Sequence, residues 1–148
     1  MRLRAGVAID LGTVNTLVCV IGRGLVLEEP SAIAVDRATG KVAAVGQAAD
    51  ALSGKEPQDI EVVHPLRDGV IADLDAAAAM LRAFLRRARL RRGVLRPSAV
   101  VCVPGGATWV ERRSLAAAVE AQRPGWGGSD AFENTIRWPH LAIDGALV

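Results

Sequence analysis

Three short apolar segments separated by glycine-containing turns open the chain, and they limit its fold more than any other feature. The segments cover residues 6–11, 16–21 and 25–28, and they are joined by Gly12-Thr13-Val14-Asn15 and Gly22-Arg23-Gly24. Connections this short join antiparallel strands, because parallel strands need a long crossover. The pattern therefore predicts an antiparallel meander of three strands that ends at Pro30.

The second half of the chain predicts two helices with a strand between them. Asp73 or Asp75 can cap the first helix, which we expect to end before Gly93. Residues 98–103 form an apolar run typical of a buried strand, parallel to an earlier one because a helix precedes it. Thr108 and Glu111 have the spacing of a capping box, and the helix that they begin is predicted to reach about residue 121. The order of elements predicts an α/β fold. One buried stripe of the first helix is expected to contain Leu74, Ala77, Ala78, Leu81, Phe84, Leu85 and Ala88.

Residues 32–64 differ from their surroundings and are predicted to form a small α+β insertion. Short strands are expected at 32–35, 42–45 and 60–63, with a short helix at 47–52. The main subdomain would then consist of residues 1–31 and 65–122. Residues 123–148 contain Trp126 and Trp138 among glycine and proline breakers, and we expect an irregular tail there.

Composition limits the classes of function that fit this chain. A length of 148 residues with 51% hydrophobic and 3% aromatic residues indicates one compact domain with an aliphatic core. The net charge of +2 is too small to predict a nucleic-acid partner. No apolar run reaches the roughly 18 residues of a membrane span, so we predict a cytoplasmic protein. Cys19 and Cys102 lie within apolar runs and are predicted to be buried thiols in a reducing compartment.

The turn after the first strand carries the clearest chemical signal. Gly12 allows close approach of a ligand to the backbone, and the following N–H groups can form a nest for an anion. Thr13 and Asn15 add side-chain donors, and Asp10 can hold a hydrated Mg²⁺ beside a phosphate. The alternative is an ordinary hairpin whose Asp and Asn side chains make local turn hydrogen bonds.

A second candidate site lies where arginines cluster without acidic residues. Val94 and Leu95 follow Gly93 inside this cluster, which resembles a contact with an anionic membrane surface. The alternative is a solvated helix face followed by the start of a strand. The basic residues of the cluster are Arg82, Arg86, Arg87, Arg89, Arg91, Arg92 and Arg96.

Four further polar residues are interpreted as having structural roles. His64 and His140 lack a partner at metal-ligand spacing, and we expect no zinc site because neither a CxxC motif nor a His-x-x-x-His spacing occurs. The pair Glu28-Glu29 precedes Pro30 and is interpreted as a solvated linker.

The segment Asp10-Leu11-Gly12-Thr13 resembles the first phosphate loop of the actin, Hsp70 and sugar-kinase superfamily. Other segments narrow the resemblance to MreB-type bacterial actins across about residues 5–122. They are residues 22–31 (GRGLVLEEPS), residues 65–73 (PLRDGVIAD), Val101-Cys102-Val103-Pro104 and Val110-Glu111-Arg112-Arg113.

This resemblance implies an RNase H-like actin-type subdomain with the small insertion described above. It implies ATP and Mg²⁺ as cofactors, with Asp10, Gly12, Thr13, Val14 and Asn15 as the phosphate loop and Asp10 reaching the metal through water. It also implies filaments formed with a full-length MreB-type actin or by self-association. These filaments lie at the inner face of the plasma membrane and guide cell shape.

The chain also departs from the family pattern. Residues 122–148 contain no Glu-Glu-Pro segment, whose second Glu positions the attacking water in this family, and no second phosphate loop. The resemblance therefore implies at most partial ATP binding and no efficient hydrolysis. Two alternatives stay open: a weak ATPase or phosphotransferase of the same superfamily, and a non-functional remnant of a reading-frame change near Gln122.

Overall fold

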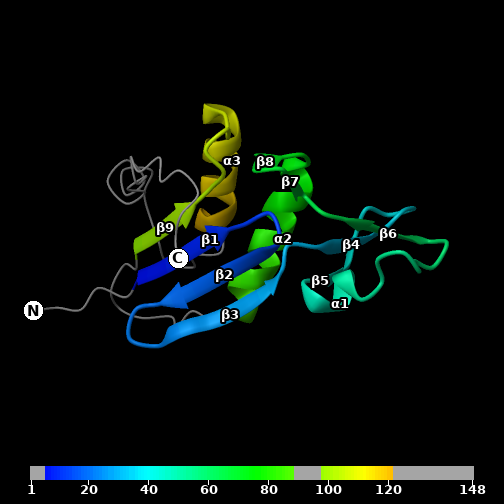
Figure 1. Ribbon diagram of the computed structural model, residues 1–148, viewed down its shortest axis with the longest axis horizontal. Coiled ribbons are helices and arrows are strands. Elements are labelled where there is room, and N and C mark those ends of the chain that lie inside the picture. The colour runs from blue at the N-terminus through cyan, green and yellow to red at the C-terminus, as the bar shows by residue number, and fades with distance from the viewer. Residues whose placement is uncertain (1–5, 89–97, 122–148) are drawn as a thin grey trace, which may run out of the picture.

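The computed structural model describes residues 6–88 and 98–121 (Figure 1). The predictions for Gly93, Val94 and Leu95 fall outside these residues, as do those for the tail and for His140. The described chain forms a four-stranded sheet with two long helices, a separate three-stranded sheet with one short helix, and a two-stranded hairpin.

The four-stranded sheet confirms the predicted meander. Strands β1 (Gly6–Leu11), β2 (Asn15–Val20) and β3 (Gly24–Pro30) pair antiparallel in sequence order. Strand β9 (Ser98–Cys102) then pairs with β1 in parallel, as expected for a strand that follows a helix. The strand order is β3-β2-β1-β9, so segments more than 90 residues apart in sequence become neighbours at the register pair Val7–Ala99.

Helices α2 (Leu74–Arg87) and α3 (Trp109–Glu120) cover one face of this sheet (Figure 1). Alternate residues of β1 point toward them, so that Val7, Ile9 and Leu11 are buried while Ala8 and Asp10 are exposed. Phe84 is fully buried in this core, whose other members are almost all aliphatic. The predicted stripe of α2 is confirmed, except that Leu74 is only partly buried.

Side-chain caps define where both long helices begin. The Asp73 carboxylate accepts a hydrogen bond from the Ala76 N–H at 2.9 Å, so Asp73 rather than Asp75 is the N-cap of α2. At α3 the Thr108 hydroxyl accepts from the Glu111 N–H, and the Glu111 carboxylate accepts from the Thr108 N–H at 2.6 Å. This reciprocal pair is the predicted capping box.

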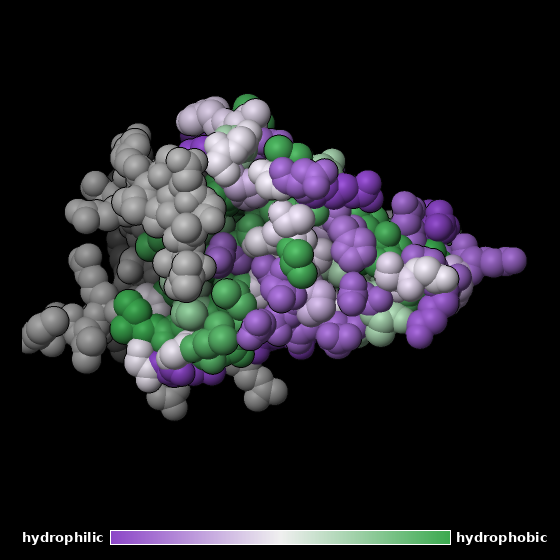
Figure 2. Space-filling view, viewed as in Figure 1, coloured by the Kyte–Doolittle hydropathy of each residue, from purple (hydrophilic) through white to green (hydrophobic). Residues whose placement is uncertain are grey.

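The other face of the four-stranded sheet is largely open to solvent in the described part of the chain. Cys19 and Cys102 lie on this face and are exposed, so the prediction that they are buried thiols is wrong. The apolar runs around both cysteines belong to strands of a sheet that has only one covered face. In such strands every second residue faces the uncovered side. Figure 2 shows hydrophobic side chains gathered over β2 and β3 on this face, where Leu25 is 52% exposed.

A small unit stands beside the main sheet and consists of β4 (Ile33–Asp36), β5 (Val42–Val45), β6 (Ile60–Val63) and α1 (Gln47–Asp50). Its strand order is β5-β4-β6, and its own small core contains Ala32, Ala34 and Ala49. The elements match the segments predicted for residues 32–64. The division of the chain into a main and an inserted subdomain stays a prediction.

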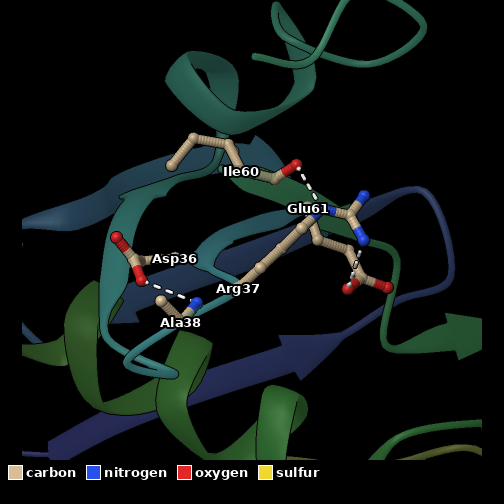
Figure 3. A network of polar contacts seen from close by, with 5 residues as sticks. All are labelled: Asp36, Arg37, Ala38, Ile60 and Glu61. Carbon is tan, nitrogen blue, oxygen red and sulfur yellow. Dashed lines mark hydrogen bonds and ion pairs between the residues drawn. The ribbon is translucent and has the colours of Figure 1, made fainter. Parts of the chain in front are cut away.

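Polar contacts hold the turn after β4 against β6 (Figure 3). The Arg37 Nε donates to the Ile60 carbonyl at 3.1 Å, and its guanidinium pairs with Glu61 at 3.4 Å. The Asp36 carboxylate accepts the Ala38 N–H at 2.9 Å (Figure 3) and is also bonded by Thr39. Hydrogen bonds from Thr39 lower the pKa of Asp36 below its ordinary value.

One element was not predicted from the sequence. Strands β7 (Leu66–Arg67) and β8 (Val70–Ile71) form a two-stranded hairpin that joins the small unit to α2. Asp68 and Gly69 make its turn, and both have positive φ, at 49° and 73°.

Candidate functional site

The turn between β1 and β2 depends on a glycine. A Cβ atom at Gly12 would lie 2.4 Å from the backbone oxygen of Asn15, which no real side chain tolerates. The tight approach leaves Thr13, Val14 and Asn15 exposed at the tip, with Val14 75% exposed. The side chains of Thr13 and Asn15 are therefore open to solvent at the turn, and the assignment of this turn as a phosphate loop stays a prediction.

Two buried hydroxyl groups hold this turn from below. The Ser31 hydroxyl donates to the Gly12 carbonyl at 2.6 Å, and the Thr16 and Ser31 hydroxyl oxygens lie 2.9 Å apart. The Ser31 N–H also donates to the Val14 carbonyl at 2.8 Å. Thr16 and Ser31 are the buried polar side chains of the described chain. Sequence reasoning missed this pair, although a hydroxyl at each strand end beside the turn was a usable signal.

An open cavity of about 530 Å³ lies against the turn. Thr13, Val14 and Asn15 form one wall together with Pro30, which ends β3. The cavity is also lined by the last residue of α1, by His64 and by residues of the β7–β8 hairpin. The lining residues there are Asp50, His64, Leu66, Arg67 and Asp68.

The hairpin is tied directly to the predicted loop. The Gly69 N–H donates to the Thr13 hydroxyl oxygen at 3.3 Å. This bond holds the Thr13 side chain at the cavity wall, next to the exposed Arg67 and Asp68. His64, which the sequence suggested to be structural, lines the cavity.

The chemistry of the lining suits an anion accompanied by a cation. Thr13 and Asn15 offer neutral donors, and Arg67 offers a guanidinium for phosphate oxygens. Asp50 and Asp68 add negative charge, which a divalent cation would offset. Among the described residues no group of three or more His, Cys, Asp or Glu side chains could hold a metal by themselves. A cation here would therefore rely on ligand phosphates and water, as Mg²⁺ commonly does.

Asp10 stands apart from the cavity lining. It lies one residue before the end of β1, opposite Leu17 on one neighbouring strand and Cys102 on the other. Its carboxylate is exposed and makes no hydrogen bond or ion pair within the described part of the chain. Partial burial, and secondarily the charge of Asp10, raise the pKa of the Cys102 thiol. The water-mediated contact of Asp10 with Mg²⁺ therefore stays a prediction.

The other predicted site residues have different outcomes. Gly12, Thr13, Val14 and Asn15 are together at the turn, and three of them line the cavity. Val94 and Leu95, the predicted membrane contact, lie outside the described residues. Within the described ranges no helix is long and apolar enough to cross a membrane.

Comparison with known proteins places these features in a family. The family model described as MreB/Mbl protein matches residues 4–128. The cell shape-determining protein Mbl of Bacillus cereus is 41% identical over 126 residues, covering 85% of this chain and 37% of that protein. The cell shape-determining protein MreB of Escherichia coli K12 is 43% identical over 145 residues, covering 94% of this chain and 40% of that protein.

Solved structures agree with the sequence matches. The crystal structure of MreB5 of Spiroplasma citri bound to ADP superposes with a TM-score of 0.68 at 36% identity, over 81% of this chain and 36% of that one. The MamK double helical filament gives a TM-score of 0.62 at 21% identity, which supports the actin-like fold alone.

The matches cover only part of each relative. The chain spans 40% or less of the length of these relatives. The family model extends to residue 128, beyond residue 122, where the motif resemblance ended. Because the model covers most of the chain and curated relatives exceed 40% identity, the chain belongs to the MreB/Mbl family of actin-like proteins.

Proposed function

We propose that this chain works in the bacterial cell-shape cytoskeleton, binds ATP with Mg²⁺ only weakly, and joins or modulates filaments of a full-length MreB-type relative. The observation that carries the nucleotide part is the Gly12–Asn15 turn opening onto the cavity. The family supports it, since MreB5 of Spiroplasma citri was crystallised with ADP and with AMPPNP. The chain covers a minor part of such relatives, so the proposal is for partial binding.

In this proposal the residues of the turn bind the phosphates. The N–H groups of Thr13, Val14 and Asn15 face the anion, and Gly12 keeps the turn tight enough to present them. Asp10 would orient a hydrated Mg²⁺ through water. When bound, that ion would neutralise charge on the phosphate oxygens.

A titration of a fluorescent ATP analogue with Mg²⁺ tests nucleotide binding. We expect measurable binding only toward millimolar nucleotide, lost in Gly12→Ala because the added Cβ meets the Asn15 carbonyl. Asp10→Ala should weaken binding in the presence of Mg²⁺ and have little effect in EDTA. Gly105→Ala is the matched control, because a Cβ there meets nothing within 4 Å.

Two results would contradict this assignment. One is the absence of binding at millimolar nucleotide in the unaltered chain. The other is equal binding by Gly12→Ala and the unaltered chain. Phosphate release in the same samples tests the weak-ATPase alternative: release above background that Asp10→Ala abolishes would favour it.

The filament part of the proposal is supported by the open edge of the main sheet. Strand β9 pairs only with β1, so within the described part of the chain its other edge has unpaired backbone groups. Such an edge adds readily to another chain. We therefore propose a full-length MreB-type actin, or a second copy of this chain, as the partner.

Co-sedimentation with a full-length MreB-type protein tests the partner. The chain should enter the pellet with the polymer or change the amount of polymer formed. If it stays in the supernatant and polymer mass does not change, the partner assignment is wrong.

We further propose a cytoplasmic location, peripheral at the inner face of the plasma membrane. The support is the sequence alone: Val94 and Leu95 lie among seven arginines. Flotation with vesicles containing anionic lipid should carry the chain upward, and Val94→Asp with Leu95→Asp should abolish flotation. Equal flotation of both forms would argue against insertion of this pair.

A further inference from the structure

Three segments from the main sheet, the small unit and α2 meet at the side chain of Glu29. Glu29 lies at the end of β3, where the chain leaves the main sheet. Its side chain is only 15% exposed, so the interpretation of Glu28-Glu29 as a solvated linker is wrong for Glu29. Glu28, its neighbour, is exposed and does fit that description.

The two carboxylate oxygens of Glu29 have different partners. Oε2 accepts the Gln47 N–H at 2.7 Å, at the first residue of α1. Oε1 pairs with the Arg87 guanidinium at 2.5 Å, at the last residue of α2. One side chain of the main sheet therefore contacts the start of one helix and the end of another.

The space for this carboxylate depends on Gly46. A Cβ atom at Gly46 would lie 2.2 Å from the Glu29 Oε2 and 2.9 Å from its Cδ. Gly46 is buried, has a φ of 64°, and precedes α1 directly as its N-cap. Because Gly46 has no side chain, it cannot accept a hydrogen bond from the first N–H groups of α1. Glu29, which belongs to β3, accepts the Gln47 N–H instead.

Only the short helix α1 separates this contact from the cavity. Helix α1 is one turn long, begins at Gln47 and ends at Asp50, which lines the cavity. Pro30, the residue after Glu29, also lines the cavity. Glu29 is therefore next in sequence to one lining residue and is hydrogen-bonded to the short helix that ends at another.

We propose that Glu29 is a positioning residue that fixes α1, and with it the Asp50 wall of the cavity, against the main sheet. The bond to the Gln47 N–H and the close fit over Gly46 do most of the holding. The Arg87 side chain is about half exposed (48%), so solvent screens its ion pair with Glu29. The pair orients the carboxylate but contributes little free energy to holding α1 in place. The expected effect of Glu29 on nucleotide binding rests on the proposed function. Its role in fixing the position of α1 does not depend on that function.

Hydrogen exchange of backbone amides, measured on the full chain, tests the holding directly. Glu29→Ala should speed exchange at residues 47–50 by about fivefold to tenfold, which is the loss of one hydrogen bond. Amides of β1 and α2 should keep their protection. Glu29→Gln, which retains an acceptor for the Gln47 N–H, should restore most of the protection.

Two neighbours are matched controls. Glu28→Ala removes an exposed carboxylate one residue away, and Arg86→Gln removes an exposed guanidinium beside Arg87. Neither side chain has a hydrogen bond or ion pair within the described residues, and neither substitution should change exchange at residues 47–50. Arg87→Gln should give a smaller increase than Glu29→Ala.

A second measurement connects the contact to the cavity. Glu29→Ala should weaken binding of the fluorescent ATP analogue several-fold, and Glu29→Gln should restore it. If the unaltered chain binds no nucleotide, the proposed function fails while the exchange experiment still decides the role of Glu29.

Some results would overturn the proposal. Unchanged exchange at residues 47–50 in Glu29→Ala would do so, and so would an equal increase in β1 and α2, which indicates general destabilisation. If Glu29→Ala does not fold, Glu29→Asp, with a side chain one methylene shorter, gives the same comparison.

Discussion

At the scale of single residues, the candidate site depends on contacts beneath its surface. The exposed residues of the Gly12–Asn15 turn are held by Thr16 and Ser31, which are buried and bonded to each other and to the turn. Buried hydroxyl groups cost free energy unless they are bonded, so this pair specifies one conformation of the turn. Glu29 has a similar role at the other wall of the cavity.

Ser31→Ala tests this support. The substitution leaves the Gly12 carbonyl and the Thr16 hydroxyl without their side-chain partner. The free energy of unfolding, measured by urea denaturation, should fall by about 1–3 kcal/mol. Ser53→Ala, at an exposed serine of the small unit, should change it by less than about 0.5 kcal/mol. Equal effects of the two substitutions would contradict the role of Ser31.

At the scale of elements, helix starts and strand types followed local rules. The capping box of α3 and the three strands of the meander lie where the sequence placed them, because caps and short turns act over a few residues. The β7–β8 hairpin was missed because two-residue strands show no alternation. Its turn, at Asp68 and Gly69, was visible only as part of a resemblance.

The capping box should make the stability of α3 depend on pH. Hydrogen bonds from the Thr108 N–H and hydroxyl lower the pKa of Glu111 below its ordinary value of 4.5. A lowered carboxyl pKa stabilises the folded state above that ordinary value, and the contribution is lost as the pH falls through the folded-state pKa. Thr108→Ala should therefore cost about 1 kcal/mol at pH 7 and less at pH 3.

Urea denaturation at the two pH values measures this difference. Glu111→Gln provides the control, because it keeps an acceptor for the Thr108 N–H and cannot titrate. Its stability should lack the part of the pH dependence that Glu111 supplies. An equal cost of Thr108→Ala at both pH values would show that the bond from the Thr108 hydroxyl to the Glu111 carboxylate plays no part in the pH dependence.

At the scale of the whole molecule, one face of the main sheet and both of its edges, at β3 and β9, stand open in the described chain. Helices α2 and α3 cover a single face, and β9 has no second partner among the described strands (Figure 1). Leu25 and Cys19 lie on the open face next to each other in register. Exposed apolar surface beside an unpaired edge favours association between chains.

Sedimentation velocity tests this expectation. The chain should show a mass that rises with concentration, and Leu25→Lys should lower the association by placing a charge on the open face. Val42→Lys, at a valine of the small unit that is 43% exposed, is the matched control and should not change it. A single monomeric species at all concentrations would contradict the expectation.

The sequence by itself determined the family, the turn at Gly12 and the elements other than the β7–β8 hairpin, because periodicity, caps and glycine turns are local properties that neighbouring residues specify. It did not determine which strand faces were covered, and Cys19 and Cys102 are exposed because α2 and α3 lie on the opposite face. Only the tertiary structure brought His64 to the cavity and Glu29 between Gln47 and Arg87. The residues in the two Glu29 contacts are 18 and 58 positions apart in sequence. Such contacts depend on how whole elements pack, which the local sequence does not specify.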